Sequence, residues 1–536
     1  MAGFYTNLRD AFLRKWNEWR GGESPKKYTG SDLPLRSELF GLVQMEQHGR
    51  LMAASHELRT GHPRRNLLDR LRENEKLLWE VTNLLAEDVQ KSRWIPPSGE
   101  WLLDNFHLIE EQTRTARRHL PKGYSRELPY LDNGPTAGFP RVYDIALEAI
   151  SHSDGRIYPE NLNAFVAAYL TVTTLELGEL WAIPIMLRLA LIENLRRVAE
   201  RIAAAREDRS RAGFWADHMM EMAARDPKNI ILTIADMARS DPPVTSSFVA
   251  ELSRRLQGQG PALALPLDWI TQRLSEAGLT IEQLVRTENQ EQTVNQVSMT
   301  NSISSLRLLS SFDWRDFVEA MSAVEHILSE DPAGVYVQMD FATRDNYRHG
   351  VERTAKYSPL TETEVTRKAI DLARDGAARK GPEDPSAHVG YYLVDEGYSL
   401  LKSAVEFRPP LGDFLRTACA KIPLSLYMGS ILFFTGMTAL ALFLRGIPGG
   451  TPLWLSVFSF ILILLGAGHA AIALVNSLSA LMIRPVELPR MDYSKGIPPD
   501  RRTLVAVPTM LANSEGVDNL LNDLEIRFLA NRDDHI

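Results

Sequence analysis

Two carboxylates, Glu100 and Asp104, stand four positions apart in the densest cluster of acidic residues in the chain. On a helix, residues four apart share a face, so both side chains would point the same way. Such a pair could supply the acid and the base of a glycoside hydrolase. Arg114, Arg117 and Arg118 follow closely, which favours a solvated or salt-bridged helix face instead. We favour the interpretation as a solvated or salt-bridged face, and we keep Glu100 and Asp104 as candidate carboxylates of a sugar groove.

A second charged segment flanks an apolar stripe at helical spacing. Its members are Glu176, Glu179, Trp181, Arg188, Glu193, Asn194 and Arg196. These side chains either form an ion-pair network that locks packed helices together or line a sugar-binding groove, and we favour the network. The charges that alternate through residues 339–348 are also expected to be structural, with Asp340 or Thr343 as the N-cap of a helix.

The sequence lacks the short motifs of several enzyme classes. It contains no glycine-rich phosphate loop, no HExxH zinc motif and no GxSxG nucleophile elbow. The single cysteine, Cys419, excludes a disulfide framework and a cysteine-based zinc cluster. With 60 basic and 68 acidic residues the formal charge is −8, which argues against a nucleic-acid binder that works through bulk charge. We therefore expect no metal ligands, no cofactor site and no nucleic-acid partner in this chain.

The elements that must position these residues are helices. Before residue 422, apolar side chains recur at the spacing of amphipathic helices, and we divide this part into an amphipathic segment, 1–60, and an all-helical region, 61–410. Predicted helices fall at 100–119, 159–177, 182–205, 212–225, 228–239, 244–257, 267–277, 280–310, 313–329, 341–355, 361–379 and 387–402. Since no window alternates strictly between apolar and polar residues, we expect no sheet there, and 334–339 is the one weak strand candidate.

Two uncharged apolar runs follow, at 422–444 and 453–483. Each exceeds the ~20 residues that span a bilayer as a helix, and the alternative is a hairpin buried in a soluble core. The loop between them is too short for a domain, so both flanks lie on one side, and the arginines and lysines of the flanks place that side in the cytoplasm. We expect a multi-pass protein of the bacterial inner membrane, with both the N-terminal region and the C-terminal end cytoplasmic and the lipid bilayer as a partner.

After a linker, 484–502, the pattern changes. The run 503–511 is apolar and rich in branched residues, which is typical of a buried parallel strand. An amphipathic helix is predicted from about 516 to 530. A strand leading into a helix is the first half of a βαβ unit. Since one strand cannot bury a parallel sheet, we expect that 503–536 begins an incomplete domain and that the chain is a piece of a longer protein.

Several long stretches are similar to one known family. They lie at 100–112, 177–199, 302–328, 331–352, 388–397 and 504–533. In order and in residue content they closely resemble the N-terminal part of bacterial cyclic β-1,2-glucan synthases, the large inner-membrane enzymes of the NdvB/ChvB type. The resemblance covers most of the chain from about residue 60 onward.

The resemblance implies a fragment of a processive glucosyltransferase that makes periplasmic cyclic glucan. In the family, a GT-A-type domain builds β-1,2-glucan from UDP-glucose with a divalent metal, Mg or Mn. This chain resembles the part before that domain's DxD and QxxRW-type motifs, so no catalytic residue carries over and we predict no transfer by the chain alone. By analogy with GT-A folds, Pro508, Thr509, Met510 and Leu511 are positional candidates for a UDP pocket, and a packed strand end is the equal alternative.

We therefore predict a mainly α protein with three parts: a large soluble helical region, a two-helix transmembrane hairpin, and the first βα unit of an incomplete GT-A-like α/β domain. Its expected function is the membrane-anchoring scaffold of a cyclic β-1,2-glucan synthase, with the rest of the synthase polypeptide and the growing glucan as partners. Two alternatives stay open. One is a membrane-anchored helical module that binds glucan or protein without catalysis, and the other is a helical glycosidase-like domain that uses Glu100 and Asp104.

Overall fold

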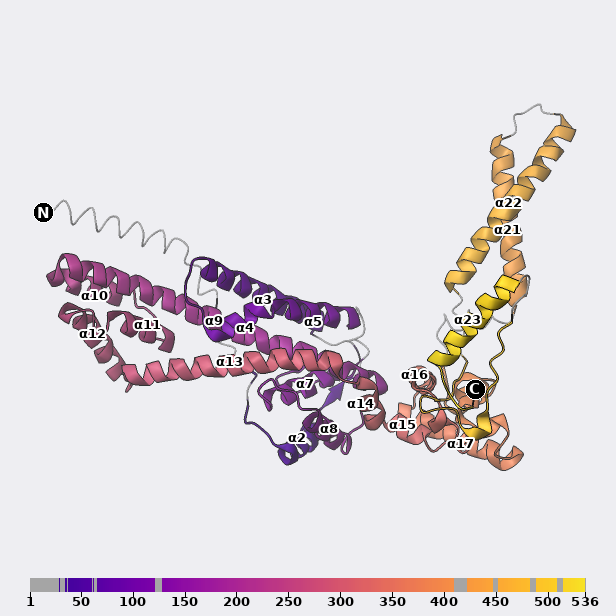
Figure 1. Ribbon diagram of the computed structural model, residues 1–536, viewed down its shortest axis with the longest axis horizontal. Coiled ribbons are helices and arrows are strands. Elements are labelled where there is room, and N and C mark those ends of the chain that lie inside the picture. The colour runs from indigo at the N-terminus through magenta and orange to yellow at the C-terminus, as the bar shows by residue number, and fades with distance from the viewer. Residues whose placement is uncertain are drawn as a thin grey trace. The chain divides into compact units, whose positions relative to one another are not determined.

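The computed structural model (Figure 1) describes residues 28, 34–35, 37–59, 61, 65–120, 128–408, 422–446, 452–482, 488–508 and 514–535. The chain divides into two compact units, Met1–Ser322 and Ala323–Ile536, which we name the first and the second unit. Nearly all of the regular structure is helical. The prediction of a mainly α protein is confirmed.

Helices of very different lengths build the first unit. They are α2 (Leu42–Ser55), α3 (Leu67–Gln90), α4 (Pro97–Asp104), α5 (Phe106–His119), α7 (Arg141–Ser151), α8 (Pro159–Leu170), α9 (Leu177–Arg225), α10 (Ile230–Arg239), α11 (Ser246–Leu256), α12 (Ala264–Ser275), α13 (Ile281–Ser311) and α14 (Trp314–Met321). The predicted helix 100–119 is interrupted at Asn105, which lies between α4 and α5. Its side-chain amide donates to the carbonyl oxygen of Trp101 at 2.9 Å, a local bond that competes with helix continuation.

Helix α9 runs for 49 residues and links two separate hydrophobic cores. Its first part, as far as Ala203, packs with α3, α7 and α13, and its last part, from Ala212, packs with α10 and α11. The sequence predicted two helices here, with Pro184 near the start of the first. That prediction is wrong, because Pro184 lies two turns inside a continuous helix. Burial of apolar side chains in both cores offsets the backbone hydrogen bond that proline removes.

A minimal sheet interrupts the helical pattern of the first unit. Strands β1 (Leu58–Arg59) and β2 (Tyr130–Leu131) pair in antiparallel fashion, with Leu58 opposite Leu131. The expectation of no sheet before residue 422 is wrong in this respect. Two-residue strands are too short to produce a recognisable alternation of apolar and polar residues.

Shorter helices make up the beginning of the second unit. They are α15 (Ala323–Leu328), η3 (Tyr336–Gln338), α16 (Phe341–Lys356), α17 (Glu362–Lys380), η4 (Pro385–Ala387), α18 (Val389–Val394) and α19 (Tyr398–Ala404). Asp340 caps α16 by accepting a 2.9 Å hydrogen bond from the backbone N–H of Thr343, as predicted. The weak strand candidate 334–339 instead forms η3, and Met339 makes an isolated bridge with Met491.

Two further helices of the second unit, α21 (Pro423–Gly446) and α22 (Leu453–Met482), are long and apolar enough to cross a membrane. They pack together, and the Tyr427 hydroxyl donates to the Asn476 side-chain oxygen at 2.7 Å. Only 6% of the most apolar window of α21 and 11% of that of α22 is buried. The alternative of a hairpin buried in a soluble core therefore does not fit the exposure of these helices.

Of the two elements predicted after the hairpin, only the helix is observed. Helix α23 (Ser514–Ala530) lies where it was expected. Residues 503–508 of the predicted strand form no strand, and Leu504 and Val505 are 93% and 62% exposed. A parallel strand needs neighbouring strands for its backbone hydrogen bonds, and no strand lies beside 503–508 among the residues described. This part of the prediction is wrong, and residues 509–511 lie outside the described residues.

Candidate functional site

The charged residues of α9 lie inside the first unit and pair with other helices. Arg141, the first residue of α7, donates from Nε and Nη2 to the two carboxylate oxygens of Glu179 at 2.6 Å each. Nη2 also donates to the carbonyl oxygen of Thr174 at 2.7 Å. Glu179 in turn accepts from the backbone N–H of Glu176 at 2.9 Å and closes a capping box. The pair therefore fixes the start of α9 to the start of α7.

Glu193 is the centre of a second network on α9. Arg70 of α3 donates to both of its carboxylate oxygens, at 2.9 and 2.6 Å, and Arg196 and Arg197 add bonds of 3.2 and 2.9 Å. Burial alone would raise the pKa of Glu193, but the hydrogen bonds from Arg70 and the charges of Arg196 and Arg70 lower it to about 2. The carboxylate is therefore ionised at neutral pH and joins α3 to α9.

Two further polar residues of α9, Asn194 and Arg188, bind α13, and Arg188 also binds α5. Asn194 Nδ2 donates to the hydroxyls of Ser298 and Ser302 at 3.0 Å each. Arg188 donates from Nε to Gln112 at 3.0 Å and from Nη2 to the carbonyl oxygen of Leu309 at 3.1 Å. Of the two interpretations of this segment, the network that locks packed helices is confirmed.

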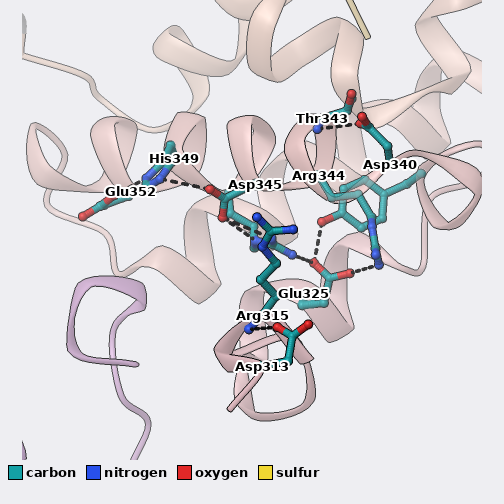
Figure 2. A network of polar contacts seen from close by, with 11 residues as sticks. Asp313, Arg315, Glu325, Asp340, Thr343, Arg344, Asp345, His349 and Glu352 are labelled. Carbon is teal, nitrogen blue, oxygen red and sulfur yellow. Dashed lines mark hydrogen bonds and ion pairs between the residues drawn. The ribbon is translucent and has the colours of Figure 1, made fainter. Parts of the chain in front are cut away.

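A similar network occupies the second unit around Glu325 (Figure 2). Its carboxylate accepts from Arg348 at 2.5 Å, from Arg344 at 3.1 Å and from the Tyr336 hydroxyl at 2.6 Å. Arg348 is fully buried and also donates to Asp345 at 3.1 Å. Burial raises the pKa of Tyr336, and the neighbouring Glu325 charge raises it further. Tyr336 therefore stays protonated and keeps donating, so this network joins α15, η3 and α16.

Both flanks of the α21–α22 hairpin are bonded to α16. Before the hairpin, the backbone N–H of Arg408 donates to the carbonyl oxygen of Tyr357, at the C-terminal end of α16, at 2.8 Å. After the hairpin, Arg490 contacts the N-terminal end: its carbonyl oxygen accepts from Asp340 N–H at 3.0 Å, and its N–H donates to the Thr343 hydroxyl at 2.9 Å. A helix of 16 residues therefore contacts the chain that enters the hairpin at one end and the chain that leaves it at the other.

The predicted carboxylate pair lies on an exposed surface. Glu100 and Asp104 both belong to α4, and both are exposed, with no hydrogen-bond or ion-pair partner among the described residues. Of the two forms expected for this face, solvated or salt-bridged, the described residues fit the solvated one: neither carboxylate pairs with the nearby arginines, and Arg117 pairs with Glu75 of α3. A pocket begins beside Ser98 on the same helix, but neither carboxylate lines it. The role of the pair in a sugar groove stays a prediction.

The residues predicted for a nucleotide pocket are mostly undescribed. Pro508 is exposed and lies outside any strand, while Thr509, Met510 and Leu511 lie outside the described residues. Their assignment to a UDP pocket stays a prediction as well.

The sequence analysis missed one cluster of ligand-type side chains, between α2 and α7. His48 Nε2 lies 3.0 Å from Glu148 Oε2, and His152 Nε2 lies 3.2 Å from the same oxygen. His48 is 100 residues away from Glu148 in the sequence, so no compact motif could reveal it. The available signal was the spacing of Glu148 and His152, which are four apart, with His152 directly after the last residue of α7, so that the two side chains lie on the same side of its C-terminal turn.

Comparison with known proteins gives one strong match. The chain is 31% identical over 464 residues, 86% of its length, to the cyclic beta-(1,2)-glucan synthase NdvB of Rhizobium meliloti (strain 1021). It spans 16% of the length of that protein. No family model matches the chain. The resemblance to cyclic β-1,2-glucan synthases is therefore confirmed.

Proposed function

We propose that this chain is the membrane-anchoring scaffold of a cyclic β-1,2-glucan synthase. The observation that carries the proposal is the 31% identity to NdvB over 86% of the chain. In this view the transferase chemistry, with UDP-glucose as donor and Mg or Mn as the metal, belongs to the rest of the longer polypeptide. The chain alone then transfers no glucose from UDP-glucose.

The two apolar helices support the anchoring role. Their surfaces are almost entirely exposed, and exposed apolar helices of this length are stable in lipid. Ala439 of α21 and Ala467 and Ala471 of α22 are buried, and small residues allow close helix packing in a membrane. We therefore propose that α21 and α22 span the inner membrane as a hairpin.

The bonds between α16 and the hairpin flanks support a shared side for both flanks. Arg408, before α21, and Arg490, after α22, both contact this one helix. A soluble helix cannot lie on both sides of a bilayer, so the two flanks face the same compartment. The basic residues of the flanks favour the cytoplasm.

The buried networks support a scaffold role for the helical units. Glu179, Glu193 and Glu325 are each held by arginines from other helices or turns of the fold. Bidentate arginine pairs restrict the geometry of the groups that they join. We propose that each unit is rigid by itself and that the transferase and the growing glucan are positioned against these units.

Exposed apolar residues near the C-terminal end support contact with the rest of the synthase. Leu504 and Val505 are largely exposed, and so are Ile526, Phe528 and Leu529 of α23. Apolar side chains gathered on a surface mark sites that another part of a protein covers. We propose that further strands and helices of the transferase domain cover them.

A chimera tests the proposal. The matching region of NdvB is replaced by this chain in a Rhizobium meliloti strain that lacks its own synthase, and periplasmic cyclic glucan is measured by mass spectrometry. We expect glucan from the chimera and none from the same chimera without residues 423–482. A chimera that is present in the membrane but makes no glucan would overturn the scaffold role. In the intact chimera, E100Q together with D104N should leave glucan unchanged, and a loss would favour the glycosidase-like alternative.

Labelling tests the topology. Cys419 is the only cysteine, so a C419S background accepts single cysteines at Ser403 and Ser494 on the two flanks and at Leu453 beside the loop. A membrane-impermeant maleimide added to spheroplasts should label only the Leu453 variant, and opened cells should expose all three. Labelling of just one flank from outside would contradict the hairpin.

A further inference from the structure

We propose that His48, Glu148 and His152 bind one divalent transition-metal ion of the zinc class and thereby clamp α2 to α7. The three ligand atoms, Nε2 of each histidine and a carboxylate oxygen of Glu148, lie within 4.8 Å of one another. His48 comes from α2 and Glu148 from α7, where His152 follows one turn later. The site lies in the first unit and is separate from the elements invoked for membrane anchoring.

The distances between the ligand atoms suit tetrahedral coordination. With metal–ligand bonds near 2.1 Å, a tetrahedral zinc ion separates its ligand atoms by about 3.4 Å. The two nitrogen–oxygen distances are 3.0 Å from His48 and 3.2 Å from His152. These two distances need to change by only a few tenths of an ångström, and the two histidine nitrogens, which lie within 4.8 Å of each other, would settle at about the same 3.4 Å separation. Imidazole nitrogen and carboxylate oxygen are both common zinc ligands.

The surrounding residues fix the orientation of the rings. His152 Nδ1 lies 2.7 Å from the carbonyl oxygen of Glu38, so this nitrogen carries the proton and Nε2 keeps its lone pair when the ring is neutral. Metal-binding histidines commonly donate their second N–H in this way. Phe40 stacks on the His152 ring at 3.8 Å between centroids, with the planes 8° apart, which restricts rotation of the ring.

The charge of Glu148 supports a cation at this point. Three other network carboxylates, Glu179, Glu193 and Glu325, are each bonded to an arginine. Glu148 instead faces only His48 and His152 among its described ion-pair partners. When His152 is neutral, its one N–H is on Nδ1 and points to the Glu38 carbonyl, so the lone pair of Nε2 and the Glu148 carboxylate face each other at 3.2 Å. A metal ion bound to Nε2 and to the carboxylate satisfies both.

The number of protein ligands leaves one coordination position open. Three protein ligands and one water are typical of zinc sites that are not closed structural centres. A small pocket adjoins His152 and is lined also by Phe40, Met45 and Asn161. Of the three proposed ligands only His152 lines this pocket, so a fourth ligand taken from it would approach the ion from the His152 side.

Metal titration of the full chain in detergent tests the site. The chain carries a tag without histidine, is stripped with a chelator, and is titrated with Zn²⁺ alone and then with Co²⁺, whose tetrahedral complexes absorb visible light. We expect one Zn²⁺ per chain, a visible Co²⁺ spectrum and a higher unfolding temperature with metal. The variants H48Q, E148Q and H152Q should weaken binding by more than the roughly 10- to 100-fold that loss of a supporting partner causes.

His349→Gln is the matched control. The ring of His349 also contacts two carboxylates, but through different nitrogens, Nδ1 to Glu352 at 2.8 Å and Nε2 to Asp345 at 3.4 Å, so it cannot gather three ligands on one ion. Circular dichroism establishes whether every variant is folded. If a histidine variant unfolds, the test rests on E148Q, which keeps the shape of the side chain. Failure of the wild type to bind Zn²⁺, or equal binding by E148Q and H349Q, would overturn the proposal.

Discussion

Arg141 and Glu179 form a two-bond ion pair that is closed to solvent, with side chains only 3% and 0% exposed. In such a place the attraction between the charges is strong, but so is the penalty for removing them from water. The net contribution of the pair to stability is therefore modest, while the loss of one partner leaves an uncompensated buried charge. This asymmetry makes the pair a sensitive test of the packing of α7 against α9.

We expect Arg141→Met to destabilise the first unit by about 3–5 kcal/mol, because Glu179 stays buried without its partner. The free energy of unfolding is measured in urea with the full chain in detergent, and the loss of protection from hydrogen exchange in α7 and α9 serves as the signal. The control is Arg59→Met, which breaks an exposed pair with Asp132 and should change stability by less than ~1 kcal/mol. Equal effects of the two variants would contradict the buried character of the Arg141 pair.

The pKa of Glu193 predicts a specific loss of stability in acid. Since its folded-state pKa is about 2 and its ordinary value is 4.5, the ionised carboxylate stabilises the fold above pH 4.5, and this contribution disappears as the pH falls from 4.5 toward 2. At neutral pH it amounts to about 3 kcal/mol. The Glu193→Gln variant should show a flatter decline of unfolding free energy in this range. If the unfolding free energies of variant and wild type fell in parallel with pH, Glu193 would be ruled out as the source of the acid-induced loss of stability.

The positions and caps of helices could be predicted from the local sequence, but whether one helix runs on into the next could not. Asp340 as the cap of α16 follows from its own side chain and the next turn. The run of α9 through Pro184 depends on two cores formed by distant helices, which no local pattern reports. The strand expected at 503–511 does not form over its described residues, 503–508, for the same reason, because a strand is stable only beside its neighbours.

The polar sites, too, combine residues that the sequence identifies with tertiary partners that it does not. Four charged residues of α9, namely Glu179, Arg188, Glu193 and Arg196, were identified from sequence because they flank an apolar stripe on one helix. Their partners, such as Arg70 and Arg141, come from helices far away along the chain. The cluster of His48 with Glu148 was missed because it depends on how α2 meets α7, which is a tertiary relationship.

Tyr336→Phe tests the Glu325 network of the second unit. The variant removes only the hydroxyl that donates to Glu325 at 2.6 Å. A hydrogen bond to a charged group contributes about 1.5–3 kcal/mol, so we expect a loss of that size in denaturant unfolding. Tyr158→Phe is the control, since Tyr158 is 42% exposed, and it should leave stability almost unchanged. If Tyr336→Phe leaves the free energy of unfolding unchanged, Arg344 and Arg348 alone would be shown to satisfy Glu325.

Two helical glycines of the second unit should respond in opposite directions to substitution by alanine. A Cβ atom on Gly376 of α17 would lie 2.1 Å from the carbonyl oxygen of Ser386, a backbone atom that cannot move aside easily. A Cβ on Gly350 of α16 would meet nothing closer than 3.5 Å. We expect G376A to destabilise the packing of α17 on η4 by about 1–3 kcal/mol or more.

We expect G350A instead to stabilise α16 by up to about 1 kcal/mol, because alanine favours the helix over glycine. Hydrogen exchange of peptides from α16 and α17 measures both effects in the full chain. Faster exchange in α17 of G376A, with equal or slower exchange in α16 of G350A, would support the close approach of Ser386 to α17. If G376A exchanged like the wild type, α17 and η4 would have to lie farther apart than the structure places them.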